Sequence, residues 1–586
     1  MRDFTISTTV PLCTASSAEK TTVLRRLAIV LFLLAVVLAG SAPAQIWNPV
    51  ATPFPGAGAY HALLLTDGTV MVQEGYNCCD ATQNWWRLAP DRSGSYIDGT
   101  WSQLASMPII GVIQYCPAAY ASAVLPDGRV IVEGGEYNCG ALSETTLGAI
   151  YDPTINYPLG QWTKVPPPTG WASIGDAPSV VLPSGTFMLG DPGSPHGTHL
   201  NALLDPITLT WTATGSNQFG YNSEATWTLL PGMYDSPTGS VLIVNACTDP
   251  TDPTCYLTDG RSSERYLPPP YGFWTPAGPP GVNLWVCFPC EIGPAVLRPD
   301  GTVFAEGASY DPTVPANTAF YHTSPSDPDY ATWTAGPVFP CNGPSDCLAA
   351  TDALASLLPN GNVLVAASPA EGSPTSFYEF TLAADYGGGS FVSVPSPPNA
   401  VNDPTYNTQL LLLPTGQVMF TDGDKDVEIY TPANQNYLPA WAPQLCNGNC
   451  TGGPGFIPPY WEARISGTGF NGMSQATMFG DDSQMATNYP IVRITFGDEV
   501  IYCRTSGFSS MGVATGNLSV STGFVCSGLP LYRYGILQVV ANGIPSNPLL
   551  VYVVAPIGVL PPQLNPHRAV CRIDSRSWAG WPSSLW

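Results

Sequence analysis

A run of β-forming residues, a short turn and a second run of β-forming residues recur seven times along the chain. The first copies read LLLTDGTVMV, AVLPDGRVIV and VVLPSGTFML. Asp-Gly and Asn-Gly between apolar runs are typical of β-hairpins, because such turns need a positive φ. The turn glycines lie 54 to 62 residues apart, which leaves room for four short strands per copy and predicts seven four-stranded units. These glycines are Gly68, Gly128, Gly185, Gly239, Gly301, Gly361 and Gly416.

A tryptophan marks the fourth strand of most units. We expect these tryptophans to pack between neighbouring units rather than to stack on a ligand; they are Trp101, Trp162, Trp211, Trp274 and Trp333. Trp47 has the same local sequence but no unit before it. Residues 47–50 are therefore predicted to pair into the last unit, because closing the ring protects exposed strand edges.

Composition excludes several classes of protein. The chain has 586 residues with 58 Gly and 62 Pro, and only 11% are charged, so long helices are excluded and an all-β fold is predicted. Lys and Arg together number 19 against 43 Asp and Glu, so nucleic acid is not expected as a partner. The chain has no P-loop, HExxH or Gly-x-Ser-x-Gly motif.

The N-terminus has the order of a secretory signal. Arg25 and Arg26 precede an apolar run over 27–40, and small residues follow up to Ala44. The run is shorter than the roughly 20 residues that span a bilayer, so residues 1–44 are predicted to be a cleaved signal peptide, with an uncleaved signal anchor as the alternative. After cleavage we expect no stable membrane span and a monomer that is secreted, either extracellular or in the cell envelope (periplasm or cell surface).

Cysteine usage agrees with export. The chain has 16 cysteines, several of them in close pairs, which favours disulfides over metal ligands. Pairing of Cys78, Cys79, Cys116 and Cys139 stays open. The predicted pairs are Cys247/Cys255, Cys287/Cys290, Cys341/Cys347, Cys446/Cys450 and Cys503/Cys526.

The hairpin repeats, with Gly134-Gly135 after the second, resemble those of kelch-type propellers. Strand-like runs after the seventh unit end in Gly543-Ile544-Pro545-Ser546, and the whole is similar to the architecture of galactose oxidase and glyoxal oxidase. This resemblance implies an all-β chain with a seven-bladed kelch-like β-propeller over 45–442 and an immunoglobulin-like β-sandwich over 459–555. Residues 443–458 would be a linker. The tail over 556–586 lacks strand periodicity and is predicted to be flexible.

The copper ligands of that family are mostly not retained. The resemblance implies a Tyr-His pair opening the last blade, a cross-linked Cys and Tyr from early blades, and a His from the C-terminal domain. Tyr406 matches the first position, but Asn407 stands where the imidazole should be. The other positions hold Ala59, Ala119 and Gln484. Copper is therefore not expected. Tyr60, His61 and Tyr120 lie one residue out of register, and they stay candidates for ligand binding together with Tyr406 and Asn407.

Four consecutive units carry a carboxylate six residues before the leucine that ends the first strand. These residues are Asp176, Glu224, Glu291 and Asp352. If this position faces the axis, the carboxylates converge on one mouth of a channel, where calcium or a polyhydroxyl ligand could balance them. The structural alternative is that acids at strand starts accept backbone hydrogen bonds. Glu74, Glu133 and Glu136 are expected to be solvated or bonded to turns, and Asp424 and Asp426 to be solvated.

Three functions remain open. The first is a secreted binding protein that recognises a glycan or a surface protein through the channel mouth and through aromatic loops at 84–87 and 271–274. The second is a galactose oxidase-like or glyoxal oxidase-like oxidoreductase with a rearranged copper site. The third is a structural envelope or matrix protein. The missing copper ligands favour the first, without copper radical oxidase activity.

Overall fold

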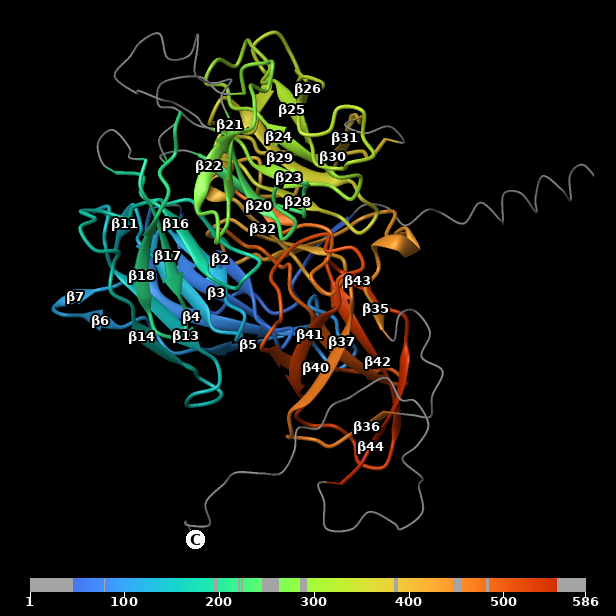
Figure 1. Cartoon of the computed structure of the whole chain (residues 1–586). Helices are drawn as coiled ribbons and strands as arrows, with labels where there is room; N and C mark the ends of the chain where they lie inside the picture. The colour runs from blue at the N-terminus through green and yellow to red at the C-terminus, as the bar shows by residue number, and fades with distance from the viewer. Residues whose placement is uncertain are drawn as a thin grey trace, which may run out of the picture. The chain divides into compact units, whose positions relative to one another are not determined.

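The computed structural model describes residues 46–77, 79–193, 199–219, 222, 225–244, 263–284, 292–383, 388–445, 455–480 and 484–555 (Figure 1). The proposed signal peptide and tail, Glu224 and Glu291 lie outside the described residues. Within the described residues the fold is all-β, as predicted, with two single-turn 3₁₀ helices, η1 (Thr405–Asn407) and η2 (Pro439–Trp441). In that part of the chain, no helix has the length and apolar character needed to cross a membrane.

The seven predicted hairpins each belong to a four-stranded antiparallel arrangement. The first three sheets follow the chain order of their strands. They contain β2 (Ala59–Leu64), β3 (Val70–Gly75), β4 (Ala81–Ala89) and β5 (Thr100–Gln103); β9 (Ala121–Val124), β10 (Val130–Glu133), β13 (Gly148–Asp152) and β14 (Gln161–Lys164); and β15 (Ser179–Val181), β16 (Phe187–Gly190), β17 (Asn201–Asp205) and β18 (Thr210–Thr214).

The remaining four sheets repeat this order with two additions. The sixth gains β27 (Leu348–Ala349) and β38 (Thr477–Met478), and the seventh gains its fourth strand, β1 (Ile46–Pro49), from the other end of the chain. The other strands are β19 (Thr226–Leu230), β20 (Ser240–Val244), β21 (Ser263–Leu267) and β22 (Phe273–Pro276); β23 (Ala295–Leu297), β24 (Thr302–Glu306), β25 (Thr318–His322) and β26 (Trp333–Ala335); β28 (Ala355–Leu357), β29 (Val363–Pro369), β30 (Ser376–Phe380) and β31 (Phe391–Val394); and β32 (Gln409–Leu412), β33 (Val418–Thr421) and β34 (Glu428–Thr431).

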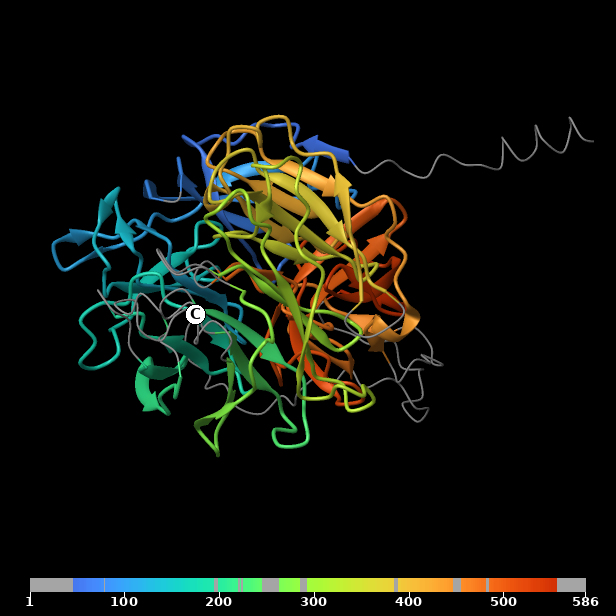
Figure 2. The same ribbon diagram turned by 90° about the horizontal axis from the view of Figure 1, so that it is seen from above.

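All seven turn glycines have positive φ, between 77° and 112°, as the hairpin prediction requires. The first strands contact one another in chain order, from β2 through β9, β15, β19, β23 and β28 to β32, and β32 contacts β2 again (Figure 2). The pairing of β1 with β34, with Trp47 opposite Tyr430, confirms the prediction that residues 47–50 join the last unit.

The tryptophans of the fourth strands bond to the preceding sheet, which confirms their predicted packing role. The Trp101 indole N–H donates to the Thr52 carbonyl oxygen at 2.9 Å, and Trp162 donates to the Ala105 carbonyl at 2.9 Å. Trp47 donates to the Pro395 carbonyl at 2.6 Å. Because each bond joins two neighbouring sheets, these indoles fix the spacing between sheets. Trp211 and Trp274 make the same bond to backbone carbonyls, whereas Trp333 donates to the Ser263 hydroxyl.

The C-terminal strands form one hydrogen-bonded β-sheet. The sheet includes two short strands, β35 (Gln444–Leu445) and β36 (Gly455–Ile457), from the segment predicted to be a linker. Its core contains buried Leu, Ile, Val and Phe side chains. The other strands are β37 (Ala463–Thr468), β39 (Ile491–Phe496), β40 (Glu499–Ser506), β41 (Val520–Val525), β42 (Tyr534–Ala541), β43 (Ile544–Pro545) and β44 (Leu549–Val553).

Three disulfides join described cysteines. Cys341–Cys347 and Cys503–Cys526 confirm two predicted pairs. The third, Cys116–Cys139, settles one pairing that the sequence left open. The pairs Cys247/Cys255, Cys287/Cys290 and Cys446/Cys450 lie outside the described residues.

Candidate functional site

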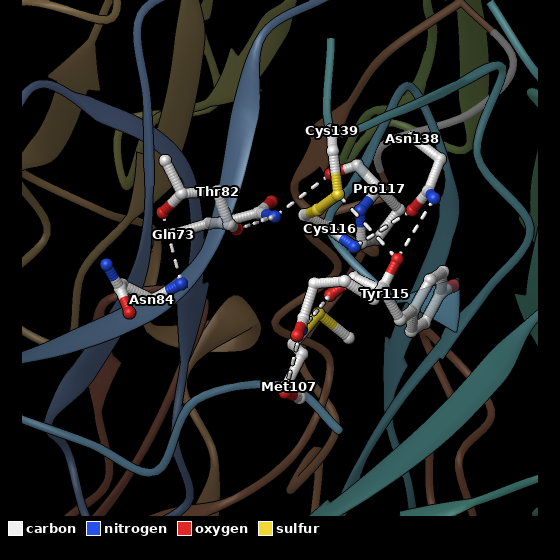
Figure 3. The surroundings of a disulfide bond; sticks show 10 residues. Gln73, Thr82, Asn84, Met107, Tyr115, Cys116, Pro117, Asn138 and Cys139 are labelled. Atoms are coloured by element: carbon white, nitrogen blue, oxygen red, sulfur yellow. Dashed lines mark hydrogen bonds between the residues drawn. A yellow bond between two sulfur atoms is a disulfide. The ribbon is translucent and has the colours of Figure 1, made fainter. Parts of the chain in front are cut away.

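A small three-stranded sheet and its disulfide hold the loop that follows β10. The sheet contains β8 (Pro117–Ala118), β11 (Tyr137–Asn138) and β12 (Ala141–Leu142). The Asn138 side chain accepts a hydrogen bond from the Cys116 amide at 2.9 Å and donates to the Gln114 carbonyl at 3.0 Å (Figure 3). Together with the Cys116–Cys139 disulfide, these bonds fix Glu136 and Tyr137 next to the second sheet.

A buried glutamine ties this small sheet to the first sheet. Gln73 donates its side-chain N–H groups to the Thr82 carbonyl at 3.1 Å and the Pro117 carbonyl at 2.9 Å (Figure 3). Its carbonyl oxygen accepts a hydrogen bond from the Tyr120 hydroxyl at 2.8 Å. Tyr120 is therefore a buried structural residue, whose hydroxyl is already used within the protein.

Three half-buried carboxyl groups act electrostatically on the half-buried carboxyl of Glu136. Burial, followed by the charges of Asp176, Asp352 and Glu144, raises the pKa of Glu136 to about 8. All the neighbouring charges that act on it are acidic. A group of like charges that lacks a facing cation is costly to ionise, which makes it attractive to a cationic or hydrogen-bond-donating ligand. These four residues, Glu136, Glu144, Asp176 and Asp352, are called the Glu136 cluster below.

Backbone bonds place the members of the cluster. The Glu136 amide donates to the Ala119 carbonyl at 2.9 Å, and the Glu144 amide donates to the Glu136 carbonyl at 2.9 Å. The Gly135 amide bonds the Gly175 carbonyl at 2.8 Å, which brings the residue before Asp176 against the same turn. The cluster therefore joins the loop after β10 to the segment that enters β15.

Two of the four carboxylates predicted from the shared register act on this one group. Asp176 and Asp352 both raise the pKa of Glu136, and Asp352 adopts a positive φ of 45° just before β28. Burial and the charge of Glu144 raise the pKa of Asp176 as well. The other two predicted members, Glu224 and Glu291, lie outside the described residues.

Two tyrosines border the cluster. Burial and the charges of Glu136 and Asp176 raise the pKa of Tyr137. Burial and the charges of Glu371 and Asp352 raise the pKa of Tyr406. Tyr406 lies in η1, which is anchored because the Thr405 hydroxyl donates to the Thr351 carbonyl at 2.6 Å. Both tyrosines, like Asn407, are half-buried, so part of each side chain is open to solvent.

His61 belongs to a separate, fully buried network. Its Nδ1 lies 3.2 Å from the side-chain oxygen of Gln409, and its Nε2 lies 3.1 Å from the Ser122 hydroxyl. Its ring meets the Tyr120 ring edge to face, with centroids 4.9 Å apart. Burial lowers the pKa of His61 to about 4, so the ring is neutral at pH 7. Tyr60, beside His61, is also buried.

A segment of the C-terminal region packs against the first strands. The Ser122 hydroxyl donates to the Gln484 carbonyl at 3.0 Å, and Met478 of β38 pairs with Ala355 of β28. A cavity of about 10 Å³, room for about one water molecule, lies between β9, β15 and this segment. Gln484, expected where the related oxidases have a histidine, is therefore buried in packing.

Two predictions about exposed residues are wrong. Glu133 was expected to be solvated or bonded to a turn, but its side chain is 0% exposed, neither of its carboxylate oxygens accepts a hydrogen bond, and burial raises its pKa well above the usual range. The segment at 84–87 was expected to be an aromatic loop, but it lies within β4, and Trp85 is completely buried. Glu136 was expected to be solvated or bonded to a turn, and it is half-buried, with its backbone bonded to Ala119 and Glu144 and its carboxyl at the centre of the cluster. In the second predicted loop, Tyr271 and Phe273 are exposed while Trp274 is buried.

Among the described residues, one group of three potential metal ligands lies close together, namely His322, Asp327 and Asp329. His322 Nδ1 lies 2.6 Å from Asp327 Oδ2, and its Nε2 lies 2.7 Å from the Thr334 hydroxyl. Both ring nitrogens of His322 thus have partners, one in the turn after β25 and one in β26. These bonds stabilise the turn, and they do not involve the Glu136 cluster.

No family model and no curated protein matches the chain. Among solved structures, the chain is similar to a fungal alcohol oxidase of the AA5 family in complex with copper, at 15% identity and a TM-score of 0.46, covering 87% of this chain and 100% of that chain. It is also similar to the extracellular domain of a protein described as a hybrid two-component system of B. thetaiotaomicron, at 11% identity and a TM-score of 0.37, covering 89% of this chain and 60% of that chain. These values are too low to transfer an activity, a metal or a ligand to this chain.

Sequence reasoning missed Glu144, Tyr137 and Gln409. Glu144 and Tyr137 lie in an irregular loop, and no periodicity marks them. The one signal that could have located them is Gly134-Gly135, whose positive φ values turn the chain from β10 toward Asp176. Gln409 opens β32 and reads as an ordinary polar strand residue.

Proposed function

We propose that the protein is a secreted binding protein that recognises a glycan through the Glu136 cluster. In this proposal the seven sheets are the blades of a seven-bladed kelch-like β-propeller, and the C-terminal strands form an immunoglobulin-like β-sandwich. The cyclic contacts of the first strands and the closure of the seventh sheet by β1 support the propeller. The disulfides support export, because such bonds persist in oxidising compartments.

The observation that carries this proposal is the charge balance at Glu136. Carboxyl groups from separate segments meet at a half-exposed position, and every neighbouring charge that acts on Glu136 is acidic. Sugar hydroxyls can donate hydrogen bonds to such carboxylates, and bonds to charged acceptors are stronger than those to neutral ones. Tyr137 and Tyr406 add partly exposed rings on which a sugar face can pack. A glycan that carries amino groups would gain further from the negative potential.

The experiment is a binding screen on a printed array of neutral, acidic and amino-sugar oligosaccharides with the purified mature chain. The strongest hit is then titrated into wild type, Glu136→Gln and Glu74→Gln by calorimetry. Glu74 is a matched control, since it is also a half-buried glutamate near the end of a second strand and lies outside the Glu136 cluster, where it accepts a hydrogen bond from the Trp86 indole at 3.0 Å. We expect Glu136→Gln to weaken binding about tenfold or more and Glu74→Gln to leave it unchanged. Binding by no oligosaccharide, or equal binding by both variants, would reject the proposal.

A surface protein is the second candidate partner, favoured by one apolar hairpin. The hairpin contains β6 (Ile109–Ile110) and β7 (Ile113–Gln114), and it exposes 96% of Val112 at its tip. Exposed apolar side chains that gather at one place often mark contacts with another protein. Replacing Val112 and Ile113 by Ser would abolish binding to such a partner and leave glycan binding intact.

A further inference from the structure

One face of the C-terminal sheet exposes apolar side chains. Buried residues alternate with exposed or half-buried ones in β36, β44 and the first half of β42, so each strand has one row that faces the core and one that faces outward. The outward row of a sheet that faces water is normally polar. Here it is apolar over three strands, and Tyr534 exposes 60% of its surface. The outward residues Phe456, Tyr534, Ile536, Leu550 and Tyr552 are called the β44 patch below.

Strand pairing makes the β44 patch continuous. Tyr552 in β44 lies opposite Tyr534 in β42 and opposite Phe456 in β36, and Leu550 lies opposite Ile536 (Figure 1). The centroid of the Tyr552 ring lies 4.7 Å from that of Tyr534 and 6.4 Å from that of Phe456. Because residues opposite one another in a sheet share a face, these side chains form one surface across three adjacent strands.

Farther along, the same face is covered within the protein. Ile536 lies opposite Thr495 in β39, and Thr495 lies opposite Val500 in β40. Val500 lies against Gly94, which follows β4 in the first sheet, and its amide donates to the Arg92 carbonyl at 2.8 Å. The β44 patch therefore extends an interface of which the first sheet covers only one side. Exposed apolar patches of this kind mark contacts with another segment or molecule.

A segment suited to this patch follows β44 directly. Residues 556–586 lie outside the described residues. They carry three tryptophans, and three arginines against one acidic residue, whereas the whole chain has 19 Lys and Arg against 43 Asp and Glu. Indole rings gain free energy when they leave water, and a basic segment is attracted to an acidic protein. The tryptophans are Trp578, Trp581 and Trp586, and the arginines are Arg568, Arg572 and Arg576.

We propose that residues 577–586 bind the β44 patch of the same chain. β44 ends at Val553, next to the patch residue Tyr552. An extended chain spans about 3.3 Å per residue, so the residues between Ala555 and Trp578 are long enough to return the tryptophans to the patch. Because the segment is tethered, its effective concentration is on the order of millimolar, and contacts too weak to hold a free peptide suffice.

The geometry of the rings favours indoles over a sugar chain as the occupant. The planes of the Phe456 and Tyr552 rings meet at 90°, and those of Tyr534 and Tyr552 at 49°. Rings inclined in this way offer edges and faces to further aromatic rings, whereas a flat sugar chain would need rings that lie in one plane. A second copy of the chain is disfavoured, because two acidic chains repel each other.

The test is limited digestion of the mature chain with trypsin, followed by mass spectrometry. Cleavage after Arg576 tracks the fraction of chains in which the segment is released from the patch. Tyr534→Ser combined with Leu550→Ser removes apolar surface from the patch and should speed this cleavage about tenfold. Tyr271→Ser combined with Leu518→Ser is the matched control, because these residues are similarly exposed but lie outside the patch. It should be cleaved at the wild-type rate.

A tail variant and a cross-link complete the test. Trp581→Ser combined with Trp586→Ser changes no described residue and should speed the same cleavage, so it decides the outcome if circular dichroism shows that the patch variant does not fold. A benzophenone amino acid in place of Tyr534 is photo-cross-linked in a mixture of isotope-labelled and unlabelled chains, and we expect links to residues 577–586 of the same chain. Cleavage of the tail variant at the wild-type rate, a link only between two chains, or no link to this segment would reject the proposal.

Discussion

The His61 network and the Glu136 cluster are built from neighbouring first strands and the segments that enter them, yet they treat polar groups in opposite ways. Both ring nitrogens of His61 have partners, and the ring is buried and neutral. Glu136 is half-exposed, and the charges around it are acidic. The difference teaches that a polar group whose bonds are complete stabilises the fold, whereas like charges left without a cation are the better candidates for binding.

The largest expected effect is the loss of stability in His61→Ala. The substitution opens a cavity among three first strands and leaves the Gln409 and Ser122 side chains without their partner. We expect a loss of about 2–5 kcal/mol, measured as a lower urea midpoint. Glycan binding by the folded fraction should not change. A variant as stable as wild type would show that the network contributes nothing to the fold.

The second effect is acid destabilisation. Because the pKa of His61 in the folded chain is about 4, below its ordinary value of 6.5, the unfolded chain takes up a proton first as the pH falls. His61 should therefore cost about 3 kcal/mol of stability between pH 6.5 and 4. Melting temperatures of wild type and His61→Gln measured across this range should converge as the pH falls. Parallel curves would mean that His61 is protonated in the folded chain.

The smallest effect is expected at the Glu136 cluster, because Glu136 is only half-buried and solvent screens the charges around it. The pKa of Glu136 in the folded chain is about 8, above the ordinary 4.5, so its contribution to stability is complete below pH 4.5 and is lost as the pH rises toward 8. Glu136→Gln should match wild type at pH 4 and melt at a slightly higher temperature at pH 8. A lower melting temperature at pH 8 would make Glu136 a structural residue, like His61, and remove the contrast between the two regions.

Local sequence predicted the repeated parts of the fold. Glycine in a hairpin turn indicates a positive φ, because it adopts this conformation without steric cost. All seven predicted turn glycines have positive φ. The place of Trp47 followed from its likeness to the other fourth-strand tryptophans, and the pairing of β1 with β34 agrees. Such features depend on residues that are near one another in the sequence or that repeat with a fixed period.

The candidate site was only partly predictable. The common position before each first strand identified Asp176 and Asp352, because it repeats with the strands. Glu136 and Glu144 were missed as members of the site, since their approach depends on a disulfide and on a backbone bond from Gly135 to Gly175. Glu133 was predicted to be solvated because it lies at a strand end. The residue opposite it in the sheet is Gly148, and the Glu133 carboxyl fills the space that a side chain at Gly148 would occupy.

The most direct test of the central claim is a crystal structure of the protein with the oligosaccharide selected by the array. We predict sugar hydroxyl or amino groups within about 3 Å of the carboxyl oxygens of Glu136 and Asp352, with a sugar ring against Tyr137 or Tyr406. An oligosaccharide bound elsewhere on the chain, with the Glu136 cluster in contact with water alone, would contradict the account.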